Sequence, residues 1–102
     1  YREAMSRAVA TDTRCTRIFS GRHARGIVNT MMERLAELEQ DIPEYPVQNA
    51  LTGALRKAAA SAGRADYLSL WAGQGVAAAR VLPAAELVQT LASELREATQ
   101  RA

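Results

Sequence analysis

Apolar residues recur at intervals of three and four in three long stretches of the chain. They fall at positions 24, 27, 28, 31, 32, 35 and 38, then at 47, 50, 51, 54, 55 and 58, and finally at 87, 88, 91, 92, 95 and 98. This spacing places the side chains on one face of an α-helix. The pattern predicts helices over residues 24–39, 46–62 and 83–100, with Met31 and Met32 as core residues of the first.

Shorter patterns complete the predicted fold. Residues 1–10 have apolar side chains at 5, 8 and 9, and residues 76–80 are rich in helix-forming Ala. Residues 15–19 combine β-branched and aromatic side chains, which favours a short extended segment. No repeat or linker divides the chain. We therefore expect a single segment over residues 1–102, mainly α, with four to five helices and at most one short strand.

A proline-rich loop separates the first two of the long helices. Pro43 and Pro46 disfavour helical conformation in the residues before them, and Pro46 suits the first turn of the helix that follows. Tyr45 is therefore expected on a rigid loop, where its hydroxyl could line a pocket or anchor the loop onto the core. At the other end of that helix, Gly63 is expected to form the C-terminal cap.

A second loop begins where Asp66 is expected to cap a helical turn over residues 67–71. It ends at Gly73, Gln74 and Gly75. The two glycines tolerate positive φ or the close approach of a ligand, and the Gln amide both donates and accepts hydrogen bonds. A Gly-x-Gly turn before a helix is most often only a turn, so the pattern alone does not assign a function.

Four blocks of sequence carry a family resemblance. They are residues 16–22 (TRIFSGR), 24–29 (ARGIVN), 45–52 (YPVQNALT) and 67–75 (YLSLWAGQG). In this order and at this spacing they resemble the C-terminal part of nitronate monooxygenases, formerly called 2-nitropropane dioxygenases. The resemblance covers nearly the whole chain. Four linked blocks are much more specific than any one of them.

The resemblance implies both a fold and an activity for a parent protein. Nitronate monooxygenases are FMN-dependent (β/α)8 barrels that use O2 to oxidise alkyl nitronates to a carbonyl compound and nitrite. A complete barrel takes about 250 residues, so this chain is expected to be the C-terminal part, after the last barrel strand. The flavin phosphate site and the catalytic His of the family would lie upstream. The segment alone is then expected to be inactive and to bind FMN weakly or not at all.

The resemblance also suggests which residues would meet the cofactor and the substrate. Trp71 would supply an apolar wall for the flavin, Gln74 its hydrogen bonds, and Gly73 and Gly75 a close backbone approach. Tyr45 would meet the nitronate oxygens. On the alternative interpretation, the two aromatic side chains only pin the C-terminal helices to the barrel. No residue of the chain is assigned a catalytic role.

Composition and charge limit the other classes of function. The chain is 48% hydrophobic but only 5% aromatic, and no apolar run approaches the ~20 residues of a membrane span. A lone Cys15 fits a reducing cytoplasm, and with His23 it has no pattern of partners for a metal site. Residues 1–26 carry six Arg but lack the interleaved aromatics of a nucleic-acid module. We expect no metal, membrane or nucleic-acid partner.

A second class of function stays open at this point. The apolar stripes could belong to a free-standing helical interaction or dimerisation module without catalysis, pairing with another chain or with a second copy. If the chain is instead an isolated piece of a barrel enzyme, its stripes belong against a barrel that is absent, so we expect a large apolar surface to remain exposed and to drive self-association.

Overall fold

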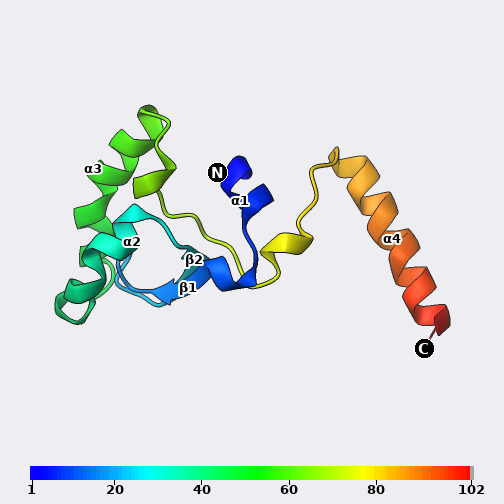
Figure 1. Cartoon of the computed structure of the whole chain (residues 1–102), viewed down its shortest axis with the longest axis horizontal. Coiled ribbons are helices and arrows are strands. Elements are labelled where there is room, and N and C mark those ends of the chain that lie inside the picture. The colour runs from blue at the N-terminus through cyan, green and yellow to red at the C-terminus, as the bar shows by residue number, and fades with distance from the viewer. Residues whose placement is uncertain (102) are drawn as a thin grey trace.

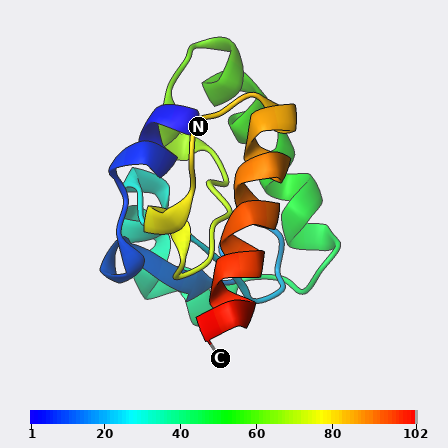
Figure 2. The same ribbon diagram turned by 90° about the vertical axis from the view of Figure 1, so that its right-hand side faces the viewer.

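The computed structural model describes residues 1–101 as a compact body joined by an extended linker to a separate C-terminal helix (Figure 1). The molecule measures 51 × 30 × 23 Å along its principal axes. When the molecule is viewed from the side on which the C-terminal helix lies, that helix is in front of the body (Figure 2). The four α-helices of this part of the chain are α1 (Arg2–Arg7), α2 (Thr30–Leu35), α3 (Val47–Ser61) and α4 (Ala84–Arg101).

Short 3₁₀ helices and a small sheet connect these four helices. The 3₁₀ helices span Ala10–Asp12, Ala36–Asp41, Ala65–Tyr67 and Val76–Ala78. The strands β1 (Thr13–Thr16) and β2 (Ala24–Ile27) pair antiparallel, with Thr13 opposite Ile27 and Thr16 opposite Ala24. Helix still dominates, so the mainly α fold class is confirmed.

Two predicted helices are confirmed closely. α3 corresponds to the helix expected over residues 46–62, and α4 corresponds to the helix expected over residues 83–100. α3 ends as its sequence indicates, because Gly63 adopts φ +69° just after the helix and its N–H donates to the Ala60 carbonyl.

The prediction for residues 24–39 is wrong in its first part. Ala24–Ile27 forms β2, and α2 begins only at Thr30, so the described chain has two strands where at most one was expected. Asn29 caps α2 by accepting a hydrogen bond from the Met32 N–H at 3.2 Å. The strand arises from pairing with β1 and from a bridge to Trp71, and such contacts override a local helical periodicity.

Three other expectations are also corrected. α1 ends at Arg7 rather than near residue 10, and the 76–80 helix is reduced to a 3₁₀ turn that ends at Ala78. Residues 68–71 are extended instead of helical. Asp66 does not cap them; it lies inside a 3₁₀ turn and pairs with the Arg64 guanidinium at 2.9 Å.

Two buried clusters form the core of the body. The first consists of Ile18, Phe19, Met31 and Met32, which confirms both methionines as core residues. The second lies where α1 meets β2 and the 68–76 segment, and consists of Ala8, Ile27, Leu70 and Val76. α4 contributes no buried residue to either cluster.

Candidate functional site

The loop formed by residues 71–75, called here the 71–75 loop, starts on the free edge of β2. The Ile27 N–H donates to the Leu70 carbonyl at 2.8 Å, and the Ala72 N–H donates to the Arg25 carbonyl at 3.2 Å. Between these two bonds, Gly26 and Trp71 form an antiparallel bridge. The backbone at the start of the loop is therefore fixed against β2 by two hydrogen bonds and an isolated bridge.

The Trp71 side chain packs on the core on one side and reaches solvent on the other. Its ring meets the Phe19 ring edge to face, with centroids 5.3 Å apart and an interplanar angle of 85°. The residue remains 37% exposed. Its carbonyl accepts a hydrogen bond from the Tyr1 hydroxyl. An aromatic ring held in this way can offer a flat apolar surface to a ligand.

The backbone conformation of the loop glycines excludes one of the two roles that their pattern allowed. Within residues 1–101, the glycines with positive φ are Gly21 and Gly63, so neither Gly73 nor Gly75 uses that freedom. A Cβ atom built on either of them would meet nothing within 4 Å. Both glycines and Gln74 between them are exposed. The space in front of the loop is open, and a ligand could approach its backbone.

Tyr45, the expected substrate contact, lies on the loop that precedes α3. It is 46% exposed, and the Arg22 guanidinium lies over its ring, 4.5 Å from the centroid. Gly21, with φ +96°, packs against this residue so closely that a Cβ there would lie 2.4 Å from the Tyr45 nitrogen. The surrounding pocket, of about 540 Å³, also has Arg17, His23 and Glu44 in its lining.

A single segment, residues 17–22, connects the two predicted site regions. Phe19 contacts Trp71, while Gly21 and Arg22 contact Tyr45. Two side chains of α3 hydrogen-bond to the backbone of this segment. Gln48 Nε2 donates to the Ile18 carbonyl at 2.6 Å, and Thr52 Oγ1 donates to the Phe19 carbonyl at 2.5 Å. The aromatic wall and the tyrosine loop thus share one support, which residue patterns alone did not reveal.

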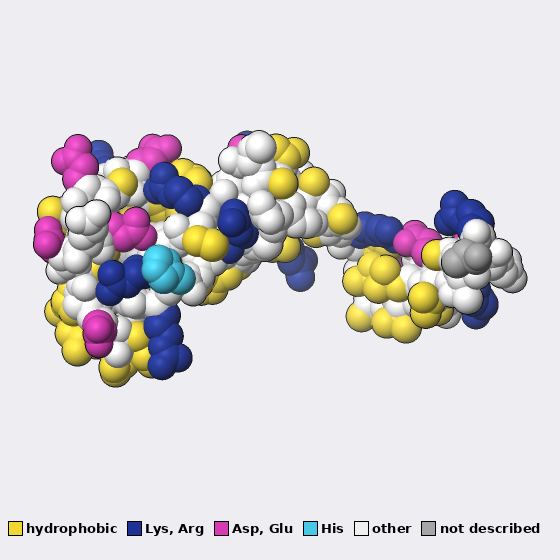
Figure 3. All heavy atoms as spheres, turned by 90° about the horizontal axis from the view of Figure 1, so that it is seen from below, with side chains coloured by type: hydrophobic (Ala, Val, Ile, Leu, Met, Phe, Trp, Pro, Cys, Tyr) yellow, Lys and Arg dark blue, Asp and Glu magenta, His cyan; other side chains and the backbone are white. Residues whose placement is uncertain are grey.

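The lining of the Tyr45 pocket contains two guanidinium groups, those of Arg17 and Arg22, and one carboxylate, that of Glu44. Arg17 uses its guanidinium internally, with Nε donating to the Gly21 carbonyl at 3.1 Å. Arg22 and His23 are exposed beside it, and Figure 3 shows the histidine among basic side chains. Such a setting favours a small anion over a cation.

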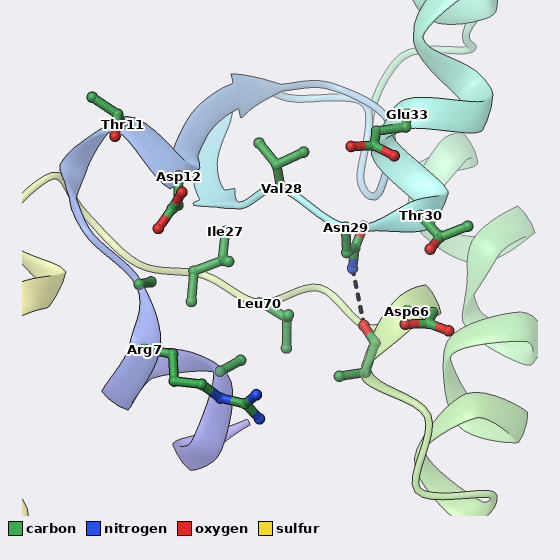
Figure 4. Close-up of a pocket in the computed structure, with 13 residues that line it drawn as sticks. Arg7, Thr11, Asp12, Ile27, Val28, Asn29, Thr30, Glu33, Asp66 and Leu70 are labelled. Carbon is green, nitrogen blue, oxygen red and sulfur yellow. Dashed lines mark hydrogen bonds between the residues drawn. The ribbon is translucent and has the colours of Figure 1, made fainter.

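Another groove of the body was not predicted from the sequence. It has a volume of about 660 Å³ and an apolar floor that includes Ala8, Ile27 and Leu70. Figure 4 shows Asp12, Asn29, Glu33 and Asp66 around its rim. Across residues 1–101, no group of three or more His, Cys, Asp or Glu side chains is arranged to hold a metal ion. None of the helices in the same range combines the length and the apolar character that crossing a bilayer would require.

Comparison with known proteins places this geometry in a family. The family model described as nitronate monooxygenase matches residues 1–94. The chain belongs to the nitronate monooxygenase family. It is 38% identical over 99 residues to a probable nitronate monooxygenase of Staphylococcus aureus strain Newman, and 38% identical over 101 residues to one of Staphylococcus saprophyticus.

A solved structure extends this family relationship to three dimensions. The crystal structure of nitroalkane oxidase from Streptomyces ansochromogenes matches 98% of the chain with a TM-score of 0.89 and 44% sequence identity. The chain spans 28% of the length of that protein and 28% of each of the two staphylococcal relatives. The resemblance to nitronate monooxygenases is thereby confirmed.

Proposed function

We propose that this chain is the C-terminal segment of an FMN-dependent nitronate monooxygenase with a (β/α)8 barrel. The parent oxidises alkyl nitronates with O2 to a carbonyl compound and nitrite. Membership of the family supports the activity, and the 28% share of the relatives' length supports the view that most of the barrel lies outside these residues. The flavin phosphate site and the catalytic base lie there too, so the segment alone is inactive.

The observation that carries this proposal is the chemistry of the 71–75 loop. A flavin ring has a flat apolar face and a polar edge, so its pocket needs an apolar wall and a few convergent polar groups. The loop combines an exposed aromatic ring, an exposed amide and two glycines with open space in front of them, on a backbone fixed by β2. These residues fit one edge of FMN. When bound, FMN accepts the electrons that the nitronate loses.

Each residue then has a definite role. Trp71 forms part of the wall, Gln74 hydrogen-bonds the flavin or the substrate, and Gly73 and Gly75 allow close approach. Tyr45 offers its hydroxyl to the nitronate oxygens, in a pocket whose cationic groups suit an anionic substrate. The exposed thiol of Cys15 agrees with a reducing cytoplasm, where we place the parent. The partners of the parent protein are small molecules, not nucleic acid.

Substitution of Gln74 by Ala in the full-length enzyme tests the assignment. Loss of one polar contact to flavin or substrate is expected to lower kcat/KM by about tenfold or more, which corresponds to roughly 1.4 kcal/mol. Gln40→Ala, an exposed position on the 3₁₀ helix Ala36–Asp41, is the matched control and should leave the kinetics unchanged. If Gln74→Ala lowers the Tm but leaves the kinetics unchanged, the loop has a structural role and does not contact flavin or substrate through Gln74.

A helical interaction module without catalysis is the second candidate. Apolar side chains exposed along α3 and α4 favour it. Titration of FMN with the 102-residue chain tests the fragment interpretation. If this chain alone quenches flavin fluorescence with micromolar affinity, it contains a complete flavin site and the fragment interpretation is wrong. The full-length kinetics separate enzyme from module.

A further inference from the structure

Residues 24–29 form a motif for which the proposed function has no use, although they lie directly beneath the 71–75 loop. β2 within this motif pairs with β1 along one edge and with residues 70–72 along the other. The segment is therefore a platform that joins the sheet to the loop.

At Gly26 the backbone of β2 packs closely against Leu70 and Trp71. A Cβ atom there would lie 3.0 Å from the Leu70 carbonyl oxygen and 3.2 Å from Cε3 of the Trp71 ring. Gly26 is buried, and its φ is not positive, so the requirement for glycine is purely steric. Any side chain at this position would push the tryptophan and its backbone away from β2.

Asn29, at the other end of the motif, hydrogen-bonds to the backbone that precedes Leu70. Its Nδ2 donates to the Leu68 carbonyl at 2.7 Å and to the Ala65 carbonyl at 3.1 Å, while its Oδ1 caps α2. Figure 4 shows the side chain reaching from the start of α2 toward the segment that leads into the loop. One amide thus fixes the path of the chain toward Leu70.

The Tyr1 hydroxyl adds a third attachment, because it donates to the Trp71 carbonyl. We propose that Gly26, Asn29 and Tyr1 are positioning residues that fix the backbone of residues 68–71 and so set where Trp71 and Gln74 stand. The consequence for the flavin rests on the proposed function. The attachment itself depends only on contacts within this chain.

Asn29→Asp separates the attachment from the helix cap. Asp caps helices about as well as Asn, so the acceptor for the Met32 N–H is kept while both amide donors are lost. Gly26→Ala tests the close contact. Its matched control is Gly53→Ala in α3, where a Cβ would meet nothing within 4 Å.

Trp71 reports on its own position, because it is the only Trp of the chain. In the 102-residue chain, Asn29→Asp and Gly26→Ala should shift its emission to the red and increase its quenching by acrylamide, while far-UV circular dichroism stays unchanged. In the full-length enzyme the same two variants should change the flavin absorption spectrum and lower kcat/KM by at least about tenfold, since small misplacements at a reacting site are costly. Gly53→Ala should change none of these.

The possible outcomes distinguish the attachment from the function. Wild-type emission and quenching in Asn29→Asp and Gly26→Ala would overturn the inference. A loosened Trp71 with unchanged flavin spectrum and nitronate kinetics would support the attachment and refute contact between the loop and the flavin. If both variants unfold, Tyr1→Phe decides, because it removes one hydroxyl from an exposed residue: a red-shifted emission supports the inference and an unchanged one overturns it.

Discussion

Glu39 shows how one carboxylate can organise the segment that supports both predicted site regions. It accepts hydrogen bonds from the Arg17 N–H at 2.8 Å and from the Thr16 hydroxyl at 2.9 Å. The Arg17 N–H is the main cause that lowers the pKa of Glu39, and the Thr16 hydroxyl and the charges of Arg14 and His23 act in the same direction. Partial burial opposes them. The carboxylate therefore fixes the start of the 17–22 segment best when it is ionised.

The lowered pKa predicts a loss of stability in acid. The unfolded chain binds a proton at Glu39 at higher pH than the folded chain does, so the contribution of this carboxylate is complete at neutral pH. It is lost as pH falls below the ordinary Glu value of about 4.3 and through the lower pKa of the folded state. Glu39→Gln should lower the free energy of unfolding at pH 7 and flatten its dependence on pH between about 5 and 3. Urea unfolding over a pH series measures both effects.

Glu37→Gln provides the control for this prediction, since Glu37 lies exposed on the same 3₁₀ helix. A pH profile for Glu39→Gln that matches those of the wild type and the control would mean that the two hydrogen bonds contribute nothing measurable to stability.

Among the elements, the sequence predicted those whose stability is local. α3 and α4 follow from an unbroken stripe with Pro at one end, and Gly63 marks where α3 ends. β2 was not predicted because it pairs with β1 and with Trp71, and the periodicity of residues 24–39 gives no information about residues outside that range. One signal was available: Asn29 is a favoured N-cap residue, and it marks the true start of α2.

The candidate site was predictable to a similar extent. The blocks around Tyr45 and Trp71 pointed to two exposed loops, and both aromatic residues are exposed on loops or strand edges. Their common support by residues 17–22 could not be predicted, because it depends on hydrogen bonds from α3 to two carbonyl groups. The loop glycines, whose pattern allowed either positive φ or the close approach of a ligand, do not have positive φ. Contact of these residues with flavin or nitronate stays a prediction.

At the level of the elements, Thr52 tests the attachment of α3 to that support. Its hydroxyl is buried and donates to the Phe19 carbonyl. Thr52→Val keeps the shape of the side chain but leaves a buried carbonyl without this donor, so the free energy of unfolding should fall by about 1–3 kcal/mol. Chemical denaturation measures the loss.

Thr99→Val is the matched control for Thr52, because Thr99 is exposed on α4 and bonds only within its own helix, to the Leu95 carbonyl. Its effect should stay within about 0.5 kcal/mol. Equal effects at the two positions would indicate that α3 does not depend on this hydrogen bond.

The shape of the whole molecule depends on α4, which stands away from the body on its linker (Figure 1). Its apolar face includes Val88, Leu91 and Leu95, which are 66%, 50% and 68% exposed. Figure 3 shows hydrophobic side chains gathered on one face of this helix. Nitroalkane oxidase matches 98% of the chain at a TM-score of 0.89, so the same extended arrangement occurs within a much longer protein.

A helix face of this kind, left uncovered in the 102-residue chain, should drive self-association. Burying one Leu side chain contributes about 1.5–3 kcal/mol, so Leu95→Glu should weaken association by roughly tenfold to a hundredfold. Ser93→Glu introduces the same charge on the opposite face of α4 and should leave association nearly unchanged. Size-exclusion chromatography with light scattering across a concentration series gives the comparison. A wild-type chain that remains monomeric at high concentration would show that the face is not adhesive, and equal effects of the two substitutions would show that charge alone controls association.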